Sequence, residues 1–83
     1  MSTASDVKKV LADVLQVGFR AEKWDSSTSL LGSIPELDSM AVVGVIGALE
    51  EHFGISVADD EITAETFSTL GSLTAFIEQK LHS

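Results

Sequence analysis

Cysteine is absent from the 83-residue chain, and histidine occurs only at positions 52 and 82. Without cysteine the protein can form no disulfide, no thiolate nucleophile and no cysteine-ligated zinc site. A catalytic serine needs a base within hydrogen-bond reach, but His52 lies a helix length from Ser39, the serine that opens a predicted helix. Two isolated histidines also make a poor metal site. We therefore expect a protein that is not an enzyme and holds no metal.

Basic side chains are scarce. Five Lys and Arg residues oppose thirteen Asp and Glu residues, which gives a net charge of −8. Nucleic acids and anionic membranes are bound mainly through Lys and Arg, so the composition argues against both kinds of partner. Acidic charge favours partners with basic surfaces and fast, salt-sensitive encounters with them. Charge that only keeps a small domain in solution explains the composition equally well.

Long hydrophobic runs are also missing. No apolar stretch approaches the ~20 residues that a membrane-spanning helix needs, and the opening MSTASDVKKV lacks the apolar centre of a signal peptide. We therefore expect a cytoplasmic monomer that does not insert into membranes. The length predicts a single domain, residues 1–83, which is too small for the deep cleft of an enzyme.

Helical periodicity dominates what the chain does contain. Apolar residues recur every three or four positions over three segments, about Ser5–Val17, Ser39–His52 and Thr69–Leu81. The acidic stretch Asp59–Glu61 is typical of the first turn of a short third helix. A long connection, Gly18–Leu37, should be pinned to the core by its apolar residues, Leu30, Leu31, Ile34 and Leu37. The predicted fold is all-α: a small four-helix bundle with three long helices, one short third helix and a long first loop.

Glycine and hydroxyl residues mark the expected helix ends. Gly18 and Gly54 should end the first two long helices, and Ser68 or Thr69 should cap the last one. The first helix carries one apolar stripe, made of Val7, Val10, Leu11, Val14 and Leu15.

The second long helix has two contrasting faces. Its predicted inner face carries Val42, Ile46, Leu49 and Phe53, flanked by Val43 and Val45. The opposite face carries Met40, Gly44, Gly47 and Glu51, with Ala41 and Ala48 beside them. Each glycine inside a helix costs about 1 kcal/mol relative to alanine. Such a face favours close docking of another molecule, and packing of another helix of this chain is the alternative.

Ser39 opens this helix directly after Asp38. A serine there is most often an N-cap, and both Ser and Asp are favoured as caps. The helix N-terminus also offers free N–H groups and a partial positive charge, which suit a covalent phosphate on the serine. The residue would then be an attachment point that an enzyme modifies in trans.

The stretch LDSMAVVGVIGALEEHFGI, residues 37–55, resembles the acyl carrier proteins, the phosphopantetheine-binding domains of fatty-acid, polyketide and related synthesis. That family's signature is Asp-Ser-Leu at the start of the second helix, then an apolar helix with an acidic end and a Phe-Gly-Ile stop. Here these elements are LDSM at 37–40, ALEE at 48–51 and FGI at 53–55. The resemblance extends over nearly the whole chain, through LTAFIEQKL near the end.

The resemblance implies a function and a set of site residues. A phosphopantetheinyl transferase would move 4'-phosphopantetheine from coenzyme A onto Ser39, with Asp38 helping to position the metal or the transferase. The arm would carry acyl groups as thioesters between acyl-transferring or acyl-activating enzymes of a lipid, polyketide or accessory pathway. The implied docking surface comprises Met40, Ala41, Gly44, Gly47 and Glu51. The implied lining of an acyl pocket comprises Ile46, Leu49 and Ile62, which would be core residues in any case.

Some positions depart from the family pattern. Met40 stands where leucine is usual, and Ala41 and Gly44 stand where fatty-acid carriers usually have acidic residues. We therefore expect partners other than the housekeeping fatty-acid synthase. Two other interpretations stay open: an aminoacyl or peptidyl carrier, and an unmodified helical module that binds a partner helix through Met40, Gly44 and Gly47.

Overall fold

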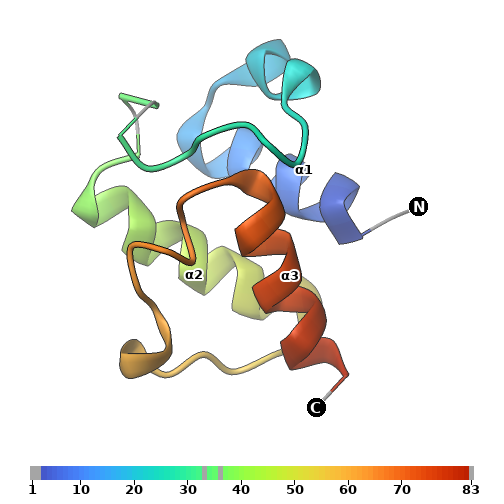
Figure 1. The fold of residues 1–83 in the computed structure, drawn as a ribbon, viewed down its shortest axis with the longest axis vertical. Helices are drawn as coiled ribbons and strands as arrows, with labels where there is room; N and C mark the ends of the chain where they lie inside the picture. The colour runs from blue at the N-terminus through green and yellow to red at the C-terminus, as the bar shows by residue number, and fades with distance from the viewer. Residues whose placement is uncertain (1–2, 33, 36, 83) are drawn as a thin grey trace.

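The computed structural model describes residues 3–32, 34–35 and 37–82. Three α-helices form the fold, α1 (Thr3–Leu15), α2 (Ser39–Phe53) and α3 (Leu70–Leu81), with two 3-10 helices, η1 (Gly18–Lys23) and η2 (Asp59–Glu61). Helix α1 packs against both α2 and α3 (Figure 1). The all-α prediction is confirmed, but the short third helix is a 3-10 turn of three residues. None of the described helices is long and apolar enough to cross a bilayer.

Helix α1 supplies one side of the core through its predicted apolar stripe. Its fully buried residues are Val7, Val10, Leu11 and Leu15, while Val14 is only partly buried against them. The helix ends at Leu15, before Gly18, because Gln16 adopts a left-handed conformation with φ of 56°. This earlier turn lets Val17 and Ala21 point back into the core, where both are buried. Gly18 therefore begins η1 and does not end α1.

Helix α2 ends where predicted, but its buried face is rotated. Gly54, with φ of 67°, takes the left-handed conformation that favours glycine, and its N–H donates to the carbonyl of Glu50. Val45 and Leu49 are the residues of α2 that are fully buried. The predicted inner residues Val42, Ile46 and Phe53 are only partly buried, because α2 turns the side that carries Val45 and Leu49 into the core. Val43 is 70% exposed.

Backbone pairing fixes the long first loop. Leu30 and Leu31 donate their N–H groups to the carbonyls of Ser68 and Phe67, and Leu70 and Gly71 donate theirs to the carbonyls of Thr28 and Ser26. An isolated antiparallel bridge between Ser29 and Thr69 lies between these bonds. Of the predicted anchors, Leu30, Ile34 and Leu37 are buried, whereas Leu31 is 40% exposed. The loop is thereby tied to the start of α3.

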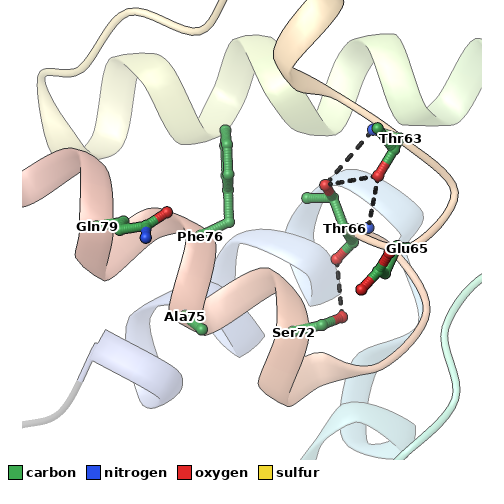
Figure 2. Close-up of a pocket in the computed structure, with 7 residues that line it drawn as sticks. All are labelled: Thr63, Glu65, Thr66, Ser72, Ala75, Phe76 and Gln79. Carbon is green, nitrogen blue, oxygen red and sulfur yellow. Dashed lines mark hydrogen bonds between the residues drawn. The ribbon is translucent and has the colours of Figure 1, made fainter.

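A double hydrogen bond caps α3. Thr69 Oγ1 accepts the N–H of Ser72 at 3.0 Å, and Ser72 Oγ accepts the N–H of Thr69 at 3.0 Å, which confirms the predicted cap at Thr69. Ser72 Oγ also donates to the carbonyl of Thr66 at 2.9 Å (Figure 2). A polar hollow of about 300 Å³ lies beside this cap, where the ring of Phe76 points from α3 toward α2 (Figure 2).

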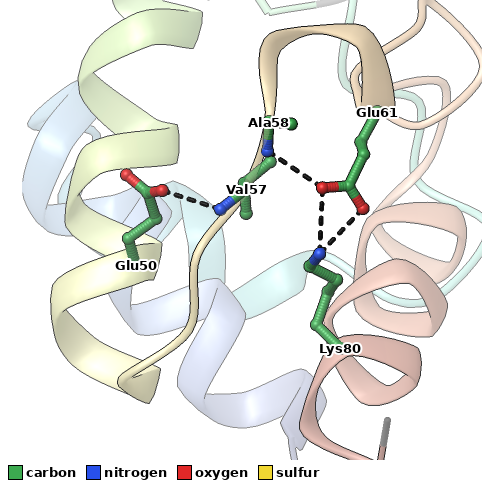
Figure 3. A network of polar contacts seen from close by, with 5 residues as sticks. All are labelled: Glu50, Val57, Ala58, Glu61 and Lys80. Atoms are coloured by element: carbon green, nitrogen blue, oxygen red, sulfur yellow. Dashed lines mark hydrogen bonds and ion pairs between the residues drawn. The ribbon is translucent and has the colours of Figure 1, made fainter.

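Two carboxylates hold the segment between α2 and α3. Glu50 Oε2 accepts the N–H of Val57 at 2.8 Å, which ties the segment to α2 (Figure 3). Glu61 Oε1 accepts the N–H of Ala58 at 2.9 Å, and Glu61 Oε2 lies 2.7 Å from Lys80 Nζ on α3. The Lys80 ammonium, together with the Ala58 N–H, holds the pKa of the Glu61 carboxyl below its ordinary value. Part of the acidic charge of this chain is therefore structurally engaged.

We expect Lys80→Met to lower the melting temperature at neutral pH by an amount that shrinks in acid. Because the pKa of Glu61 is lower in the folded chain than in the unfolded chain, ionised Glu61 stabilises the fold above the unfolded pKa, near 4.5. This stabilisation is lost as the pH falls through the lower, folded pKa. Thermal melts of both proteins from neutral pH into acid measure the difference.

Lys9→Met is the matched control, because Lys9 is exposed on α1 and its removal changes the net charge equally. A melting-temperature loss for Lys80→Met that equals the loss for Lys9→Met, or that does not depend on pH, would contradict the role given to the ion pair.

Candidate functional site

Asp38, and not Ser39, caps helix α2. Asp38 has extended backbone angles, its Oδ1 accepts the N–H of Ala41 at 2.8 Å, and its carbonyl accepts the N–H of Val42 at 2.9 Å. Ser39 is the first residue inside the helix. The sequence allows either residue as the cap, because both types are favoured there and they are neighbours. The structure thus gives Ser39 no capping role.

The hydroxyl of Ser39 is free. Ser39 is exposed, and its side chain makes no hydrogen bond within the described part of the chain. It stands at the N-terminal end of a 15-residue helix, where unpaired N–H groups and the helix dipole favour an anionic substituent. A phosphodiester on Ser39 Oγ therefore fits this position.

The chain offers Ser39 no histidine in its own helix turn. His52 lies thirteen residues later on α2, which corresponds to about 20 Å along the helix axis. A side-chain base must lie within hydrogen-bond distance of the hydroxyl that it deprotonates. Among the described residues, no group of three or more His, Asp or Glu side chains is placed to hold a metal ion. The carboxylate next to Ser39, that of Asp38, is engaged at Oδ1 by the N–H of Ala41.

A mostly apolar hollow of about 330 Å³ opens beside Ser39. Its lining residues are Leu31, Ser39, Val42, Ile62, Thr63, Ala64 and Phe67. Ile62 is the one of the three suggested pocket residues that lies in this lining. Ile46 is partly buried elsewhere along α2, and Leu49 is 1% exposed within the core.

Sequence reasoning missed Leu31, Ala64 and Phe67 as neighbours of Ser39. These residues come from the first loop and from the segment before α3, and the backbone pairing between those two regions brings Leu31 to Phe67. No local sequence pattern predicts the contact between Leu31 and Phe67, because these residues lie more than thirty positions apart in the sequence.

The outer face of α2 is open. Met40 is 81% exposed and Val43 is 70% exposed. Gly44, Gly47 and Glu51 are also exposed, whereas Ala41 is partly buried. The structure therefore places four of the five suggested docking residues on one exposed face that begins next to Ser39. Val43, which the sequence assigns to the flank of the inner face, joins this outer surface.

We expect Asp38→Ala to destabilise the fold by about 1 kcal/mol, the usual loss when a capping side chain is removed. Asp38→Asn should lose only a few tenths of a kcal/mol, because asparagine caps about as well as aspartate. Urea denaturation of the three proteins measures the difference. Equal stability of Asp38→Ala and wild type would show that the hydrogen bond to Ala41 contributes nothing to the free energy of unfolding. Ser39 would then be the alternative N-cap of α2.

Comparisons with known proteins point in one direction. The family described as "Phosphopantetheine attachment site" matches residues 5–77. The chain is 39% identical over 79 residues to an acyl carrier protein of Sulfurovum sp. (strain NBC37-1), with 94% of this chain and 97% of that protein covered. Its fold is similar to the solution NMR structure of a holo acyl carrier protein from Nitrosomonas europaea, with a TM-score of 0.93 and 57% identity. That match covers 100% of both chains.

Proposed function

The chain belongs to the acyl carrier protein family, whose members carry a phosphopantetheine attachment site, and on this premise we propose that Ser39 bears the arm. One observation carries the proposal. Ser39 is exposed and free of hydrogen bonds within the described chain, while its neighbour Asp38 does the capping. A hydroxyl that the fold does not use is available for modification.

Transfer to Ser39 is a substitution at phosphorus. Ser39 Oγ attacks the phosphorus of coenzyme A that is bonded to pantetheine, and the bond from that phosphorus to adenosine 3',5'-bisphosphate breaks. The serine proton passes to a base of the phosphopantetheinyl transferase, because no histidine lies near Ser39 and the adjacent Asp38 carboxylate is engaged as the helix cap. When bound, the arm would supply a thiol that holds an acyl group as a thioester. Asp38 contributes by fixing the helix start that presents the hydroxyl.

The hollow beside Ser39 gives an acyl chain its first apolar surface. Ile62 lies in that hollow, next to Val42 and Phe67. An acyl chain longer than the hollow would have to displace the side chains of Ile46 and then Leu49, which pack further along α2. We therefore assign these three residues to successive depths of one pocket.

Partner enzymes would dock on the outer face of α2. Met40, Gly44, Gly47 and Glu51 are exposed there, and Ala41 lies at the edge of the same face. The transferase and the acyl-transferring or acyl-activating enzymes all have to reach Ser39 or the arm on it. This shared requirement supports one docking surface for several partners.

An acyl cargo is favoured over an aminoacyl cargo by the apolar lining of the hollow. Loading of the holo protein with fatty acids and with amino acids, each by a matching activating enzyme, separates the two. Acyl loading together with no aminoacyl loading is expected. Preferential aminoacylation would assign the chain to the aminoacyl or peptidyl carriers.

Intact mass tests the proposed function. The apo protein is incubated with coenzyme A and a broad-specificity phosphopantetheinyl transferase, and the mass should rise by one phosphopantetheine. No gain with two unrelated transferases, on protein shown to be folded, would contradict the carrier function. An unmodified interaction module would be the remaining interpretation.

A further inference from the structure

Lys80 is the only Lys or Arg residue of the chain after Lys23. Residues 24–83 contain ten Asp and Glu residues and this one lysine, which lies in the last turn of α3. Its Nζ donates to both carboxylate oxygens of Glu61, at 2.9 and 2.7 Å (Figure 3). Glu61 is the last residue of the 3-10 helix η2, so the ion pair joins the segment between α2 and α3 to the far end of α3.

The ion pair holds a different part of this segment than the other carboxylate contact does. Glu50 Oε2, on α2, accepts the N–H of Val57 at 2.8 Å. Glu61 lies four positions later, and Ile62 directly follows it. The side chain of Ile62 lines the apolar hollow at the start of α2. The contact between Glu61 and Lys80 therefore fixes the part of the segment that forms a wall of the hollow.

The side of the core beneath the segment is covered less completely than the rest. Helices α2 and α3 each pack on α1, but they approach one another far less closely, and the segment turns back through η2 before it reaches α3 (Figure 1). Several apolar side chains of α2, α3 and the segment are only partly buried: Ile46, Phe53, Ile55, Ile62 and Phe76. A region with fewer buried contacts opens at a lower free energy than the rest of a fold.

We propose that the Glu61–Lys80 ion pair determines how long an acyl chain this carrier shelters, because it holds Ile62 at the wall of the hollow. The inference rests on the proposed function of Ser39 and of the hollow beside it. A short acyl chain enters the hollow of about 330 Å³ as it stands, whereas a long chain needs Ile62 and its neighbours to move away from α2. That movement separates Glu61 from Lys80, while the contact at Val57 stays in place.

The exposure of the ion pair suits a contact that opens without unfolding the chain. The side chains of Lys80 and Glu61 are 22% and 35% exposed. Solvent weakens an ion pair of this kind, so that it shifts an equilibrium by only a few-fold. Loss of the pair should therefore favour the open arrangement by about threefold.

Thioester cleavage of the acyl-loaded protein tests the proposal. A broad-specificity phosphopantetheinyl transferase transfers the arm from butanoyl- or hexadecanoyl-coenzyme A to Ser39, and hydroxylamine then takes the acyl group and releases the thiol. Cleavage of the hexadecanoyl thioester should be about twofold to threefold slower in Lys80→Met than in the wild type, because a chain that enters further leaves its thioester less often in solvent. Cleavage of the butanoyl thioester should be unchanged.

Two variants are the matched controls, and both should cleave the hexadecanoyl thioester at the wild-type rate. Lys80→Arg keeps a cation that can pair with Glu61. Lys9→Met removes the same charge from an exposed position on α1. A role of Lys80 in stability alone predicts the opposite direction, because a loosened fold exposes the thioester and speeds its cleavage.

Amide hydrogen exchange of the apo chain tests the same proposal without the arm. The N–H groups of Ala58 and Glu61 make hydrogen bonds within the part of the segment that the ion pair holds, to Glu61 Oε1 and to the carbonyl of Ala58. Both should exchange faster in Lys80→Met than in the wild type. The N–H of Val57 should exchange at an unchanged rate, because Glu50 still accepts it.

The possible outcomes differ for the inference and for its premise. A wild type that never accepts the arm overturns the function of Ser39. If the wild type accepts the acyl group but Lys80→Met cleaves the hexadecanoyl thioester equally fast or faster, only the role of the ion pair is overturned. An equal effect of Lys9→Met would assign the change to net charge and would also overturn it. Faster exchange at Val57 would show that the whole segment loosens, which contradicts a restraint confined to the part next to Ile62.

Discussion

Ser39→Ala will abolish the uptake of phosphopantetheine and leave the bundle folded. The substitution removes the attacking oxygen, so no phosphodiester can form. It removes no structural contact within the described chain, because the cap of α2 is Asp38 and the Ser39 hydroxyl makes no hydrogen bond there. The free energy of unfolding should therefore change by less than about 0.5 kcal/mol, as for other exposed positions. Intact mass after transferase treatment and urea denaturation measure the two effects.

Ser56→Ala is the matched control for this experiment. It removes the hydroxyl of another exposed serine and leaves both Asp38 and Ser39 in place. We expect it to accept the arm. If Ser39→Ala still gained one phosphopantetheine, another serine would be the attachment site. If Ser39→Ala unfolded the protein, the Ser39 hydroxyl would be needed for the start of α2, which would contradict its being free of structural contacts.

Gly71→Ala will destabilise the fold by about 1–3 kcal/mol, the range for added atoms in a tight contact. Gly71 lies in the first turn of α3, and its N–H donates to the carbonyl of Ser26 at 2.8 Å. A Cβ at this position would lie 2.7 Å from that carbonyl oxygen and 3.1 Å from Ser26 Cβ. The backbone of the first loop would have to move, and the pairing that holds it to α3 would weaken. For a chain of this size, each kcal/mol corresponds to about 4–8 °C in melting temperature.

Gly47→Ala is the opposite case and serves as the control. Gly47 is inside α2, and an added Cβ would meet nothing within 4 Å. Alanine is the better helix former, so Gly47→Ala should stabilise the fold by up to about 1 kcal/mol. Thermal melts of both variants decide the point. A stabilising Gly71→Ala would show that the first loop does not pack on α3 as described.

Local sequence patterns predict the long helices and the position of Ser39 well. The apolar stripe of α1, the end of α2 at Gly54 and the cap of α3 at Thr69 all depend on residues close together in sequence. Helical periodicity and capping chemistry act over the same short range. Local patterns predict where α2 starts but not which residue caps it. Asp38 and Ser39 are both good caps, and only the structure distinguishes them.

Contacts between distant residues could not be predicted from such patterns. The bond between Leu30 and Ser68, the ion pair between Glu61 and Lys80 and the burial of Val45 in the core each depend on how the elements pack. These contacts decide which side chains surround Ser39. The sequence consequently predicts the serine, but not that Leu31 and Phe67 line the hollow beside it.

Site-resolved mass spectrometry tests the central claim most directly. The transferase-treated protein is digested, and the modified peptide is fragmented to locate the phosphodiester. We predict that it lies on Ser39 and on no other hydroxyl, although Ser26, Ser27, Ser29, Ser56 and Ser68 are also exposed. Phosphopantetheine on any of those residues, or on none, would contradict the assignment of Ser39 as the attachment site.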